Sequence, residues 1–189
     1  MPASDTSDPR SERSRAQLAD ALRALLLTRD PRDISVSALC AEAGVSRPTF
    51  YQHFASIDEV AVAGVERRFA QLRAELPDGP DASPRLVARY LDELDTERAT
   101  WRRTIGSGSV LAASRDAVET WFADRLAELA PDAGPTTVRY AAAGFLGVVR
   151  AWLCEEDGPG RRSPARLAAD LAELSDRVLG PAGGPTLGA

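Results

Sequence analysis

Apolar residues recur every three to four positions along most of the chain, which is the spacing of amphipathic helices. The first stripe runs through Leu18, Leu22, Leu25 and Leu26 and predicts a helix over about 11–29. No segment shows the strict alternation of a half-buried strand, so we predict an all-α fold. The same spacing predicts later helices over about 57–76, 84–95, 97–105, 109–130, 136–155 and 163–179.

Between the first two of these helices, residues 35–54 contain two further short helices around a glycine. Ser35 and Ser46 each precede a short apolar-periodic run, where a hydroxyl can cap a helix N-terminus. Gly44 between the runs supplies the left-handed residue that ends a helix without a Cβ clash. Two short helices around such a turn predict a helix-turn-helix that fits the major groove of DNA.

The second short helix is predicted to bury one face and present a polar one. Phe50 and Phe54 lie four residues apart and therefore share the buried face. Arg47 is our first choice for a base contact, because a guanidinium can bond guanine O6 and N7 together, and a phosphate contact is the alternative. Thr49 and Gln52 have groups that suit base edges, although a solvated helix face would also carry them.

Ala43-Gly44-Val45-Ser46 followed by Thr49-Phe50-Tyr51-Gln52-His53-Phe54 resembles the DNA-binding domain of the tetracycline-repressor (TetR) family, over roughly residues 11–60. The resemblance implies that Tyr51 and His53 face the phosphate backbone, and the alternative for Tyr51 is a half-buried core ring. The helix N-termini at Ser35 and Ser46 also suit phosphates. The predicted DNA contacts are Ser35, Ser46, Arg47, Pro48, Thr49, Tyr51, Gln52 and His53.

Two positions depart from the pattern of that family. Ile57 stands where the family usually has a lysine that reaches phosphate, which removes one cation from the expected interface. Pro48 replaces a glycine often found before the threonine, although the first turn of a helix tolerates proline. Neither change breaks the motif.

The net charge of −5 is unusual for a DNA-binding protein. Residues 1–76 contain 10 arginines and 11 acidic residues, and residues 77–189 contain 13 and 17. DNA binding must therefore depend on a local basic patch, for which Arg10, Arg13, Arg15 and Arg47 are the candidates.

The segment from Pro77 to Pro84, rich in proline, glycine and aspartate, is the clearest internal break and sets a domain boundary. The predicted organisation is a disordered arm (1–10), a helix-turn-helix DNA-binding domain (11–56), a connecting helix (57–76), a ligand-binding and dimerisation domain (77–179) and a disordered tail (180–189).

The helix predicted over 136–155 is apolar on nearly every side and must bury two faces. Together with the last helix it suits a four-helix interface between two subunits, and the alternative is the central helix of a monomeric core. The predicted dimer contacts are Ala141, Gly144, Val148, Trp152, Leu167, Leu171 and Leu174.

The resemblance implies that the C-terminal domain encloses a small-molecule effector site whose occupancy changes the spacing of two DNA readers. The alternative is that the same apolar side chains fill a core. The predicted pocket residues are Trp101, Ile105, Leu111, Trp121, Phe122, Tyr140 and Phe145.

Other classes of protein have little support. His53 is the only histidine, and we expect Cys40 and Cys154 to be reduced, buried thiols, so neither a metal site nor a cofactor is predicted. An enzyme would need a catalytic motif that the chain lacks. The N-terminus has no secretory signal and the longest apolar run, 140–149, is too short to span a bilayer, which predicts a cytoplasmic protein.

The sequence therefore predicts a homodimeric transcriptional repressor that a small molecule releases from a pseudo-palindromic DNA operator. A DNA-binding regulator controlled by a protein partner, or by no ligand, is the alternative, and an activator is possible in place of a repressor.

Overall fold

The computed structural model describes residues 9–75, 82–106 and 109–179, and these residues form helices and no strand, which confirms the predicted all-α fold. Most of the predicted arm and all of the predicted tail lie outside the described residues, whereas Pro9 and Arg10 begin the first helix. The helices are α1 (Pro9–Leu26), the 3-10 helix η1 (Pro31–Asp33), α2 (Val36–Ala43), α3 (Arg47–His53), α4 (Ile57–Ala74), α5 (Ala82–Thr96), α6 (Arg98–Ile105), α7 (Ala112–Leu129), α8 (Pro135–Leu153) and α9 (Pro164–Leu179).

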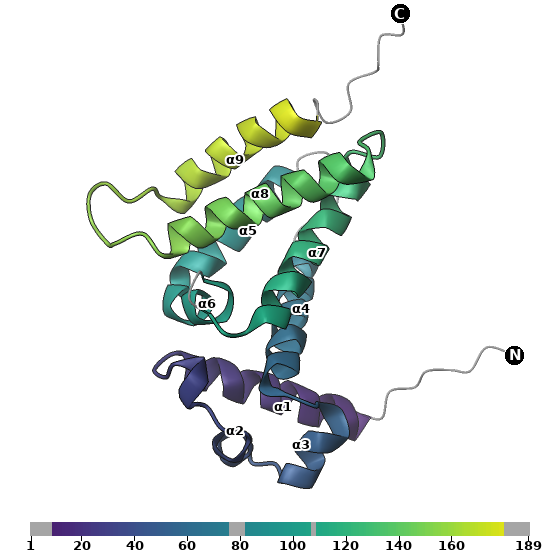
Figure 1. The fold of residues 1–189 in the computed structure, drawn as a ribbon, viewed down its shortest axis with the longest axis vertical. Coiled ribbons are helices and arrows are strands. Elements are labelled where there is room, and N and C mark those ends of the chain that lie inside the picture. Colours follow the sequence, from purple (N-terminus) through teal and green to yellow (C-terminus); the bar gives the residue numbers. More distant parts are fainter. Residues whose placement is uncertain (1–8, 76–81, 107–108, 180–189) are drawn as a thin grey trace, which may run out of the picture.

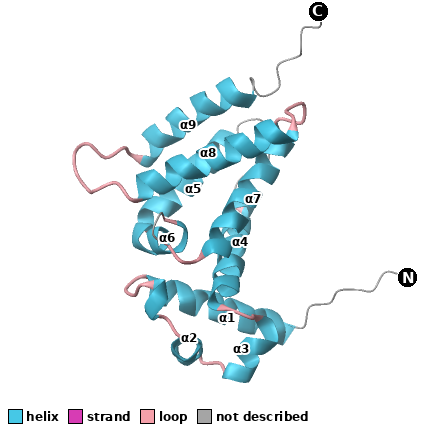
Figure 2. Cartoon of the chain, viewed as in Figure 1, coloured by secondary structure: helices cyan, strands magenta, loops and turns pink. Residues whose placement is uncertain are grey.

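The helices form two groups along the long axis of the molecule (Figure 1). Helices α1, α2 and α3 form one end, and α5, α8 and α9 lie toward the other. Helix α4 rises from the first group beside α7, and short loops join most neighbouring helices (Figure 2). The helix-turn-helix thus occupies one tip of an elongated molecule.

A first hydrophobic cluster holds the N-terminal group together. The predicted stripe of α1 is confirmed, because Leu18, Leu22, Leu25 and Leu26 are each at most 6% exposed. They pack with residues of α2, α3 and the start of α4, among them Leu39 and Phe50, which are both fully buried. Burial of each such side chain contributes about 1.5–3 kcal/mol, so this small unit has a substantial core.

A second cluster joins α4 to the helices that follow. Helix α4 contributes to both clusters, because Val60 and Ala61 belong to the first and Val65, Phe69 and Leu72 belong to the second. The exact limits of the domains, including a boundary at 76/77, stay a prediction. Helix α4 therefore connects the two hydrophobic cores as one continuous helix.

The second cluster corrects part of the predicted dimer interface. Trp152 and Leu167 are fully buried and Leu171 is 3% exposed, all within the core of the single chain. The indole N–H of Trp152 also donates to the carbonyl oxygen of Arg162 at 2.8 Å. These three side chains pack α8 against α9 and the rest of the core, so they are not available to a second subunit. Of the other candidates, Ala141 and Val148 are half-buried and Gly144 and Leu174 are exposed.

Candidate DNA-binding surface

The turn between α2 and α3 has the geometry that the sequence predicted. The Ser35 hydroxyl accepts a hydrogen bond from the N–H of Ala38 at 3.1 Å and so caps α2. Gly44 ends α2 with φ 66° and ψ 28°, a left-handed conformation that an L side chain would strain. The N–H of Val45 then donates to the carbonyl of Cys40 at 3.1 Å, which closes the turn.

Helix α3 is capped in the same way. The Ser46 hydroxyl accepts from the N–H of Thr49 at 3.2 Å, and the hydroxyls of Ser46 and Thr49 lie 2.7 Å apart. Pro48 lies in the first turn, where no intrahelical donor is needed. The Thr49 hydroxyl therefore already has one partner within the protein, and its methyl group and remaining hydrogen-bonding capacity are left for a base.

Helix α3 buries its aromatic face and exposes the opposite one. Phe50 is fully buried and Phe54 is 4% exposed, whereas Tyr51 is 55% exposed. The half-buried alternative for Tyr51 is therefore wrong. Of the eight predicted DNA contacts, Thr49 and His53 are half-buried and the remaining six are exposed: Ser35, Ser46, Arg47, Pro48, Tyr51 and Gln52.

Helix α1 holds the C-terminal end of α3 in place through Arg15. The Arg15 guanidinium donates to the carbonyl oxygen of His53 at 3.2 Å and lies 4.5 Å from the centre of the Phe54 ring. Ser11 Oγ lies 3.5 Å from His53 Nδ1. Arg15 therefore fixes the reading helix and keeps its positive charge there, and Arg13, another residue of the predicted basic patch, is exposed.

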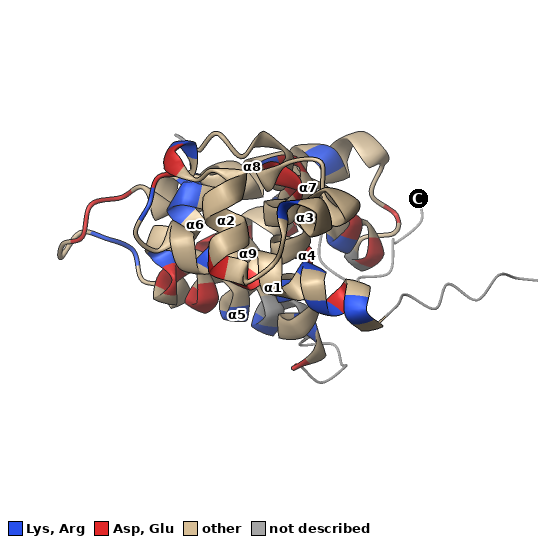
Figure 3. Ribbon diagram, turned by 90° about the horizontal axis from the view of Figure 1, so that it is seen from below, with Lys and Arg blue, Asp and Glu red and all other residues tan. Residues whose placement is uncertain are grey.

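The helix-turn-helix itself carries few charges (Figure 3). Arg47 is the only arginine in α3, and Glu42 is the only acidic residue in α2. Burial raises the pKa of the Cys40 thiol, and the positive charge of Arg47 lowers it by a smaller amount. Arg47 is thus the main cationic group that this reading helix can offer.

The start of α4 explains the departure at Ile57. Ile57 is half-buried and packs against the first hydrophobic cluster, so an apolar side chain suits the position. The Ser56 hydroxyl accepts from the N–H of Glu59 at 3.2 Å, and the Glu59 carboxylate accepts from the N–H of Ala55 at 2.7 Å. These two hydrogen bonds resemble a capping box, with the return bond going to Ala55 in place of the N-cap residue Ser56.

The predicted pocket residues do not all share one site. Trp101, Trp121, Phe122 and Phe145 form one aromatic cluster together with Phe69 and Tyr90, with ring centroids of neighbouring pairs 4.4–6.2 Å apart. Ile105 is buried in the same core. Two of the seven predicted pocket residues lie elsewhere, because Leu111 packs in the N-terminal cluster and Tyr140 is 72% exposed. The aromatic rings that remain pack against one another, as in the alternative in which they fill a core.

Several contacts that the sequence did not reveal join the two groups of helices. The Arg103 guanidinium of α6 donates to the carbonyls of Leu26 and Leu27 at 2.8 and 2.9 Å, at the end of α1. Arg23 Nε donates to Glu97 Oε2 at 2.6 Å. The Asp58 carboxylate accepts a hydrogen bond from the backbone N–H of Ala113, in the first turn of α7, at 2.9 Å. These contacts join residues 55 to 77 positions apart, so no local pattern in the sequence indicates them.

The two cysteines differ in exposure. Cys40 is buried, as predicted, whereas Cys154 follows the end of α8 and is exposed, which corrects the expectation for that residue. Within the described part of the chain, no helix is long and apolar enough to cross a membrane. Those same residues contain no group of three or more His, Cys, Asp or Glu side chains arranged to hold a metal ion.

Comparisons with known proteins agree with this geometry. Residues 18–63 match the model of the family described as bacterial regulatory proteins, tetR family. A TetR transcriptional regulator from Rhodococcus sp. RHA1 has a similar fold, with a TM-score of 0.64 and 20% identity over 91% of this chain and 98% of that one. A TetR transcriptional regulator from Streptococcus agalactiae 2603V has a TM-score of 0.60 and 18% identity over 90% of this chain and 95% of that one. A tetR-family transcriptional regulator from Streptomyces coelicolor has a TM-score of 0.52 and 21% identity over 92% of each chain. A search among curated proteins finds no match.

An exposed, capped reading helix on a helical scaffold defines a DNA-binding transcriptional regulator. The family model covers the segment that contains α2 and α3, and the solved structures share the fold of nearly the whole chain. Residues 18–63 are thus similar to bacterial regulatory proteins of the tetR family, and nearly the whole chain shares the fold of solved TetR-family regulators.

Proposed function

We propose that this regulator is a cytoplasmic homodimeric repressor that binds a pseudo-palindromic operator and leaves it when a small molecule binds. The observation that carries the proposal is the exposed face of α3, with Arg47, Tyr51 and Gln52 on a helix that Arg15 holds at its C-terminal end. Arg47 reads guanine, Gln52 reads a neighbouring base edge, and Tyr51 and His53 position the helix on the phosphates.

A dimer follows from the small number of bases that one short helix can read. Two readers related by a two-fold axis bind half-sites about 34 Å apart or a multiple of that distance. Helix α8 supports this proposal, because its outer face exposes small residues and one ring that is 72% exposed. Small side chains let two helices approach closely. The exposed positions on this face of α8 are Tyr140, Ala143, Gly144, Gly147 and Ala151.

Control by a ligand requires that the effector stabilise one arrangement of the two readers over another. An effector that binds the released state about 100-fold more tightly supplies about 2.7 kcal/mol of coupling. The contacts of Arg103, Arg23 and Asp58 between the two groups of helices provide the mechanical connection for such a change.

A second candidate function is a regulator that responds to a protein partner or to no ligand. The observation that favours it is the packed aromatic cluster, whose ring centroids lie 4.4 Å apart at the closest pair, Phe122 and Phe145. The rings occupy the place where an internal effector pocket was expected. In this case, operator affinity would not respond to small molecules.

The first experiment is fluorescence anisotropy with DNA that flanks the regulator's own gene, titrated against salt. We expect specific binding that falls steeply as salt rises, because phosphate contacts release counterions. Arg47→Ala should weaken specific binding about 10- to 100-fold, which corresponds to about 1–3 kcal/mol for a bidentate base contact. Arg102→Ala, which removes an exposed arginine from α6, is the matched control and should change little.

Equal affinity for operator and random DNA would contradict the proposal, provided that DNA obtained by unbiased selection also binds no better than random DNA. Sedimentation equilibrium tests the dimer independently. Gly144→Glu places a charge on the exposed face of α8, where an added Cβ meets no atom within 4 Å in the single chain. We expect this variant to be monomeric and folded, and a wild-type monomer would contradict the proposed interface.

A further inference from the structure

One face of α8 stays uncovered within the single chain. Ala142, Val149 and Trp152 of this helix are buried in the second hydrophobic cluster. The opposite face exposes four small residues in its middle, and an added Cβ at either of its glycines meets no atom within 4 Å. Small residues alone do not identify what covers this face. They are Ala143, Gly144, Gly147 and Ala151.

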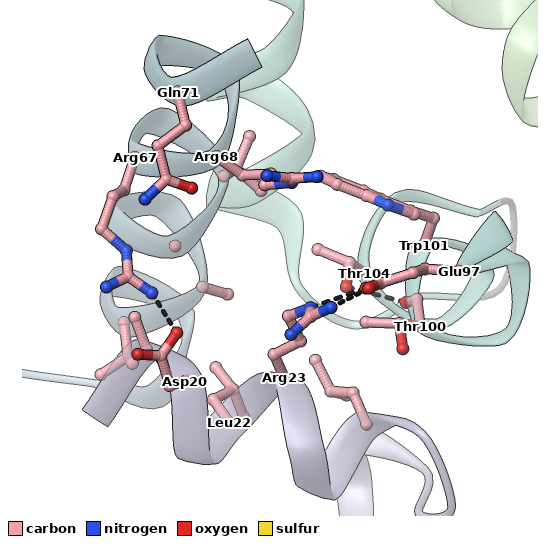
Figure 4. A pocket seen from close by; sticks show the side chains of 16 residues that line it. Asp20, Leu22, Arg23, Arg67, Arg68, Gln71, Glu97, Thr100, Trp101 and Thr104 are labelled. Carbon is pink, nitrogen blue, oxygen red and sulfur yellow. Dashed lines mark hydrogen bonds and ion pairs between the residues drawn. The ribbon is translucent and has the colours of Figure 1, made fainter. Parts of the chain in front are cut away.

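Two larger side chains flank the small residues, one toward each end of the helix. The Tyr140 side chain is 72% exposed. Arg150 is half-buried, and within the described part of the chain no carboxylate pairs with it. By contrast, Arg67, which is also half-buried, pairs with Asp20 (Figure 4). A guanidinium is attracted to the face of an aromatic ring, so Tyr140 and Arg150 are complementary, but the about 15 Å between them along α8 keeps them apart within one chain.

The direction of α8 determines how a second copy of this helix can approach. Helix α8 runs across the long axis of the molecule, whereas the DNA-reading helix α3 lies at one end of that axis (Figure 1). In the proposed homodimer both readers must lie at the same end to bind one duplex, so the two-fold axis runs along the long axis. A two-fold axis that crosses α8 places this helix antiparallel to its copy.

The exposed residues of α8 then define the register of this antiparallel pair. Residues on either side of a two-fold axis face each other when they lie at equal distances from it. Two helices approach most closely where their side chains are small, which places the axis at position 145, midway between Ala143 and Gly147. Tyr140 and Arg150 each lie five positions from this centre, on opposite sides of it. Residues 136, 140, 143, 147, 150 and 154 follow one another every three or four positions, so they share one side of the helix.

We propose that α8 packs against α8 of a second copy of this chain in this register, and that the Tyr140 ring stacks on the guanidinium of the partner's Arg150. The two-fold axis creates this contact twice, so one cation–π pair lies at each end of the seam of small residues. These pairs fix the register, because an axis at position 147 would separate each ring from its guanidinium by about 6 Å along the helix. The proposal rests on the proposed homodimer and adds the surface and the residue pairs that form it.

A chemical cross-link to the native Cys154 tests the register. Thr136 and Cys154 each lie nine positions from the centre and are both exposed, so Thr136 faces the partner's Cys154. Thr136→Cys treated with a short bismaleimide should therefore run as a covalent dimer on a denaturing gel. The wild type should not, because its two Cys154 thiols lie about 27 Å apart along the helices and Cys40 is buried.

Two further cysteine variants are the controls for this cross-link. Tyr140→Cys faces the partner's Cys154 only if the axis lies at position 147, so Thr136→Cys should cross-link faster than Tyr140→Cys. Glu42→Cys adds an exposed thiol in α2, at the DNA-reading end, and should give no covalent dimer.

Sedimentation equilibrium tests the cation–π pair. Tyr140→Leu and Arg150→Met should each weaken dimerisation about tenfold, because each removes both copies of the contact. The double variant should be about as weak as either single variant, since both changes remove the same interaction. Tyr140→Phe keeps the ring and should dimerise like the wild type. Arg102→Met, which removes an exposed arginine of α6, is the matched control.

The outcomes separate this proposal from the general one. A dimeric wild type in which Thr136→Cys cross-links no faster than Tyr140→Cys or Glu42→Cys would refute the register and leave the homodimer intact. Fully additive losses in the double variant, or an effect of Arg150→Met no larger than that of Arg102→Met, would refute the pairing. A monomeric wild type would contradict the homodimer itself and this interface with it.

Discussion

The Asp58 carboxylate, in the first turn of α4, caps the N-terminus of α7 through Ser114. Asp58 Oδ1 accepts from the backbone N–H of Ser114 at 3.2 Å and lies 3.1 Å from the donating Ser114 hydroxyl. Asp58 Oδ2 accepts from the N–H of Ala113 at 2.9 Å. A residue at the end of the DNA-reading module thus satisfies orphan donors of a helix that begins 54 positions later in the chain. This contact ties the orientation of the reader to α7.

Loss of this cap should destabilise the protein. Asp58→Ala leaves the N–H groups of Ala113 and Ser114 without their partner, and loss of a helix cap costs about 1–2 kcal/mol. We expect the midpoint of urea unfolding to fall accordingly, and hydrogen exchange at the first turn of α7 to become faster. Asp124→Ala, which removes an exposed acid from the middle of α7, should change the midpoint little. Equal destabilisation by both variants would contradict a specific capping role.

Gly64 should be replaceable by alanine with a gain in stability. It lies inside α4, and a Cβ at this position would meet the Cβ of Ala19 at 3.6 Å, an ordinary van der Waals distance. Glycine within a helix is less stable than alanine by about 0.5–1 kcal/mol. Gly64→Ala should therefore raise the unfolding midpoint. Gly44→Ala is the contrasting variant and should lower it, because φ there is 66°. An unfolding midpoint for Gly64→Ala below that of the wild type would show that α1 and α4 cannot accommodate the methyl group.

Features that depend on neighbouring residues were predictable from the sequence. Ser35, Gly44 and Ser46 define α2 and α3 because a cap or a left-handed residue acts within three or four positions. The Leu18 stripe was predictable for the same reason, since helical periodicity identifies the face that must be buried. The position and polarity of the reading helix could therefore be derived before the structure.

Features that depend on which helices meet were not predictable. Trp152 and Tyr140 lie on the same apolar helix, yet one is fully buried in the single chain and the other is 72% exposed. Periodicity shows that α8 has two apolar faces, but it cannot show which face α9 covers. The same limit applies to Arg15, whose partner is the carbonyl of His53, 38 positions away.

The two thiols should react at very different rates. Cys154 is exposed, whereas Cys40 is 4% exposed and burial raises the pKa of its thiol, which lowers the fraction of reactive thiolate. The native protein should release one equivalent of thionitrobenzoate from Ellman's reagent quickly and a second only on unfolding. Cys154→Ser should lose the fast phase and Cys40→Ser should keep it. A fast phase that survives in Cys154→Ser would show that α2 opens readily.

Tyr90 should make stability depend on pH in the alkaline range. Its hydroxyl donates to the carbonyl of Phe69 at 3.2 Å and its side chain is 2% exposed. Burial raises the pKa of Tyr90 above its ordinary value, and the charges of Arg125 and Arg73 lower it by less. The folded state therefore holds the proton more tightly than the unfolded state, in which the pKa is about 10. This contribution to stability is complete below about pH 10 and is lost as the pH rises toward the folded pKa, by up to about 1.4 kcal/mol per pH unit.

Urea unfolding of the wild type and Tyr90→Phe at pH 8 and pH 11 measures this effect. The chain contains no lysine, so lysine titration does not contribute between these values. At pH 8 the variant should be less stable by about 1 kcal/mol, because the hydrogen bond from the Tyr90 hydroxyl to the Phe69 carbonyl is lost. At pH 11 this difference should shrink or reverse, because only the wild type has to keep a buried tyrosine protonated. A constant difference at both pH values would mean that Tyr90 ionises equally well in the folded protein, and hence that water reaches the aromatic cluster.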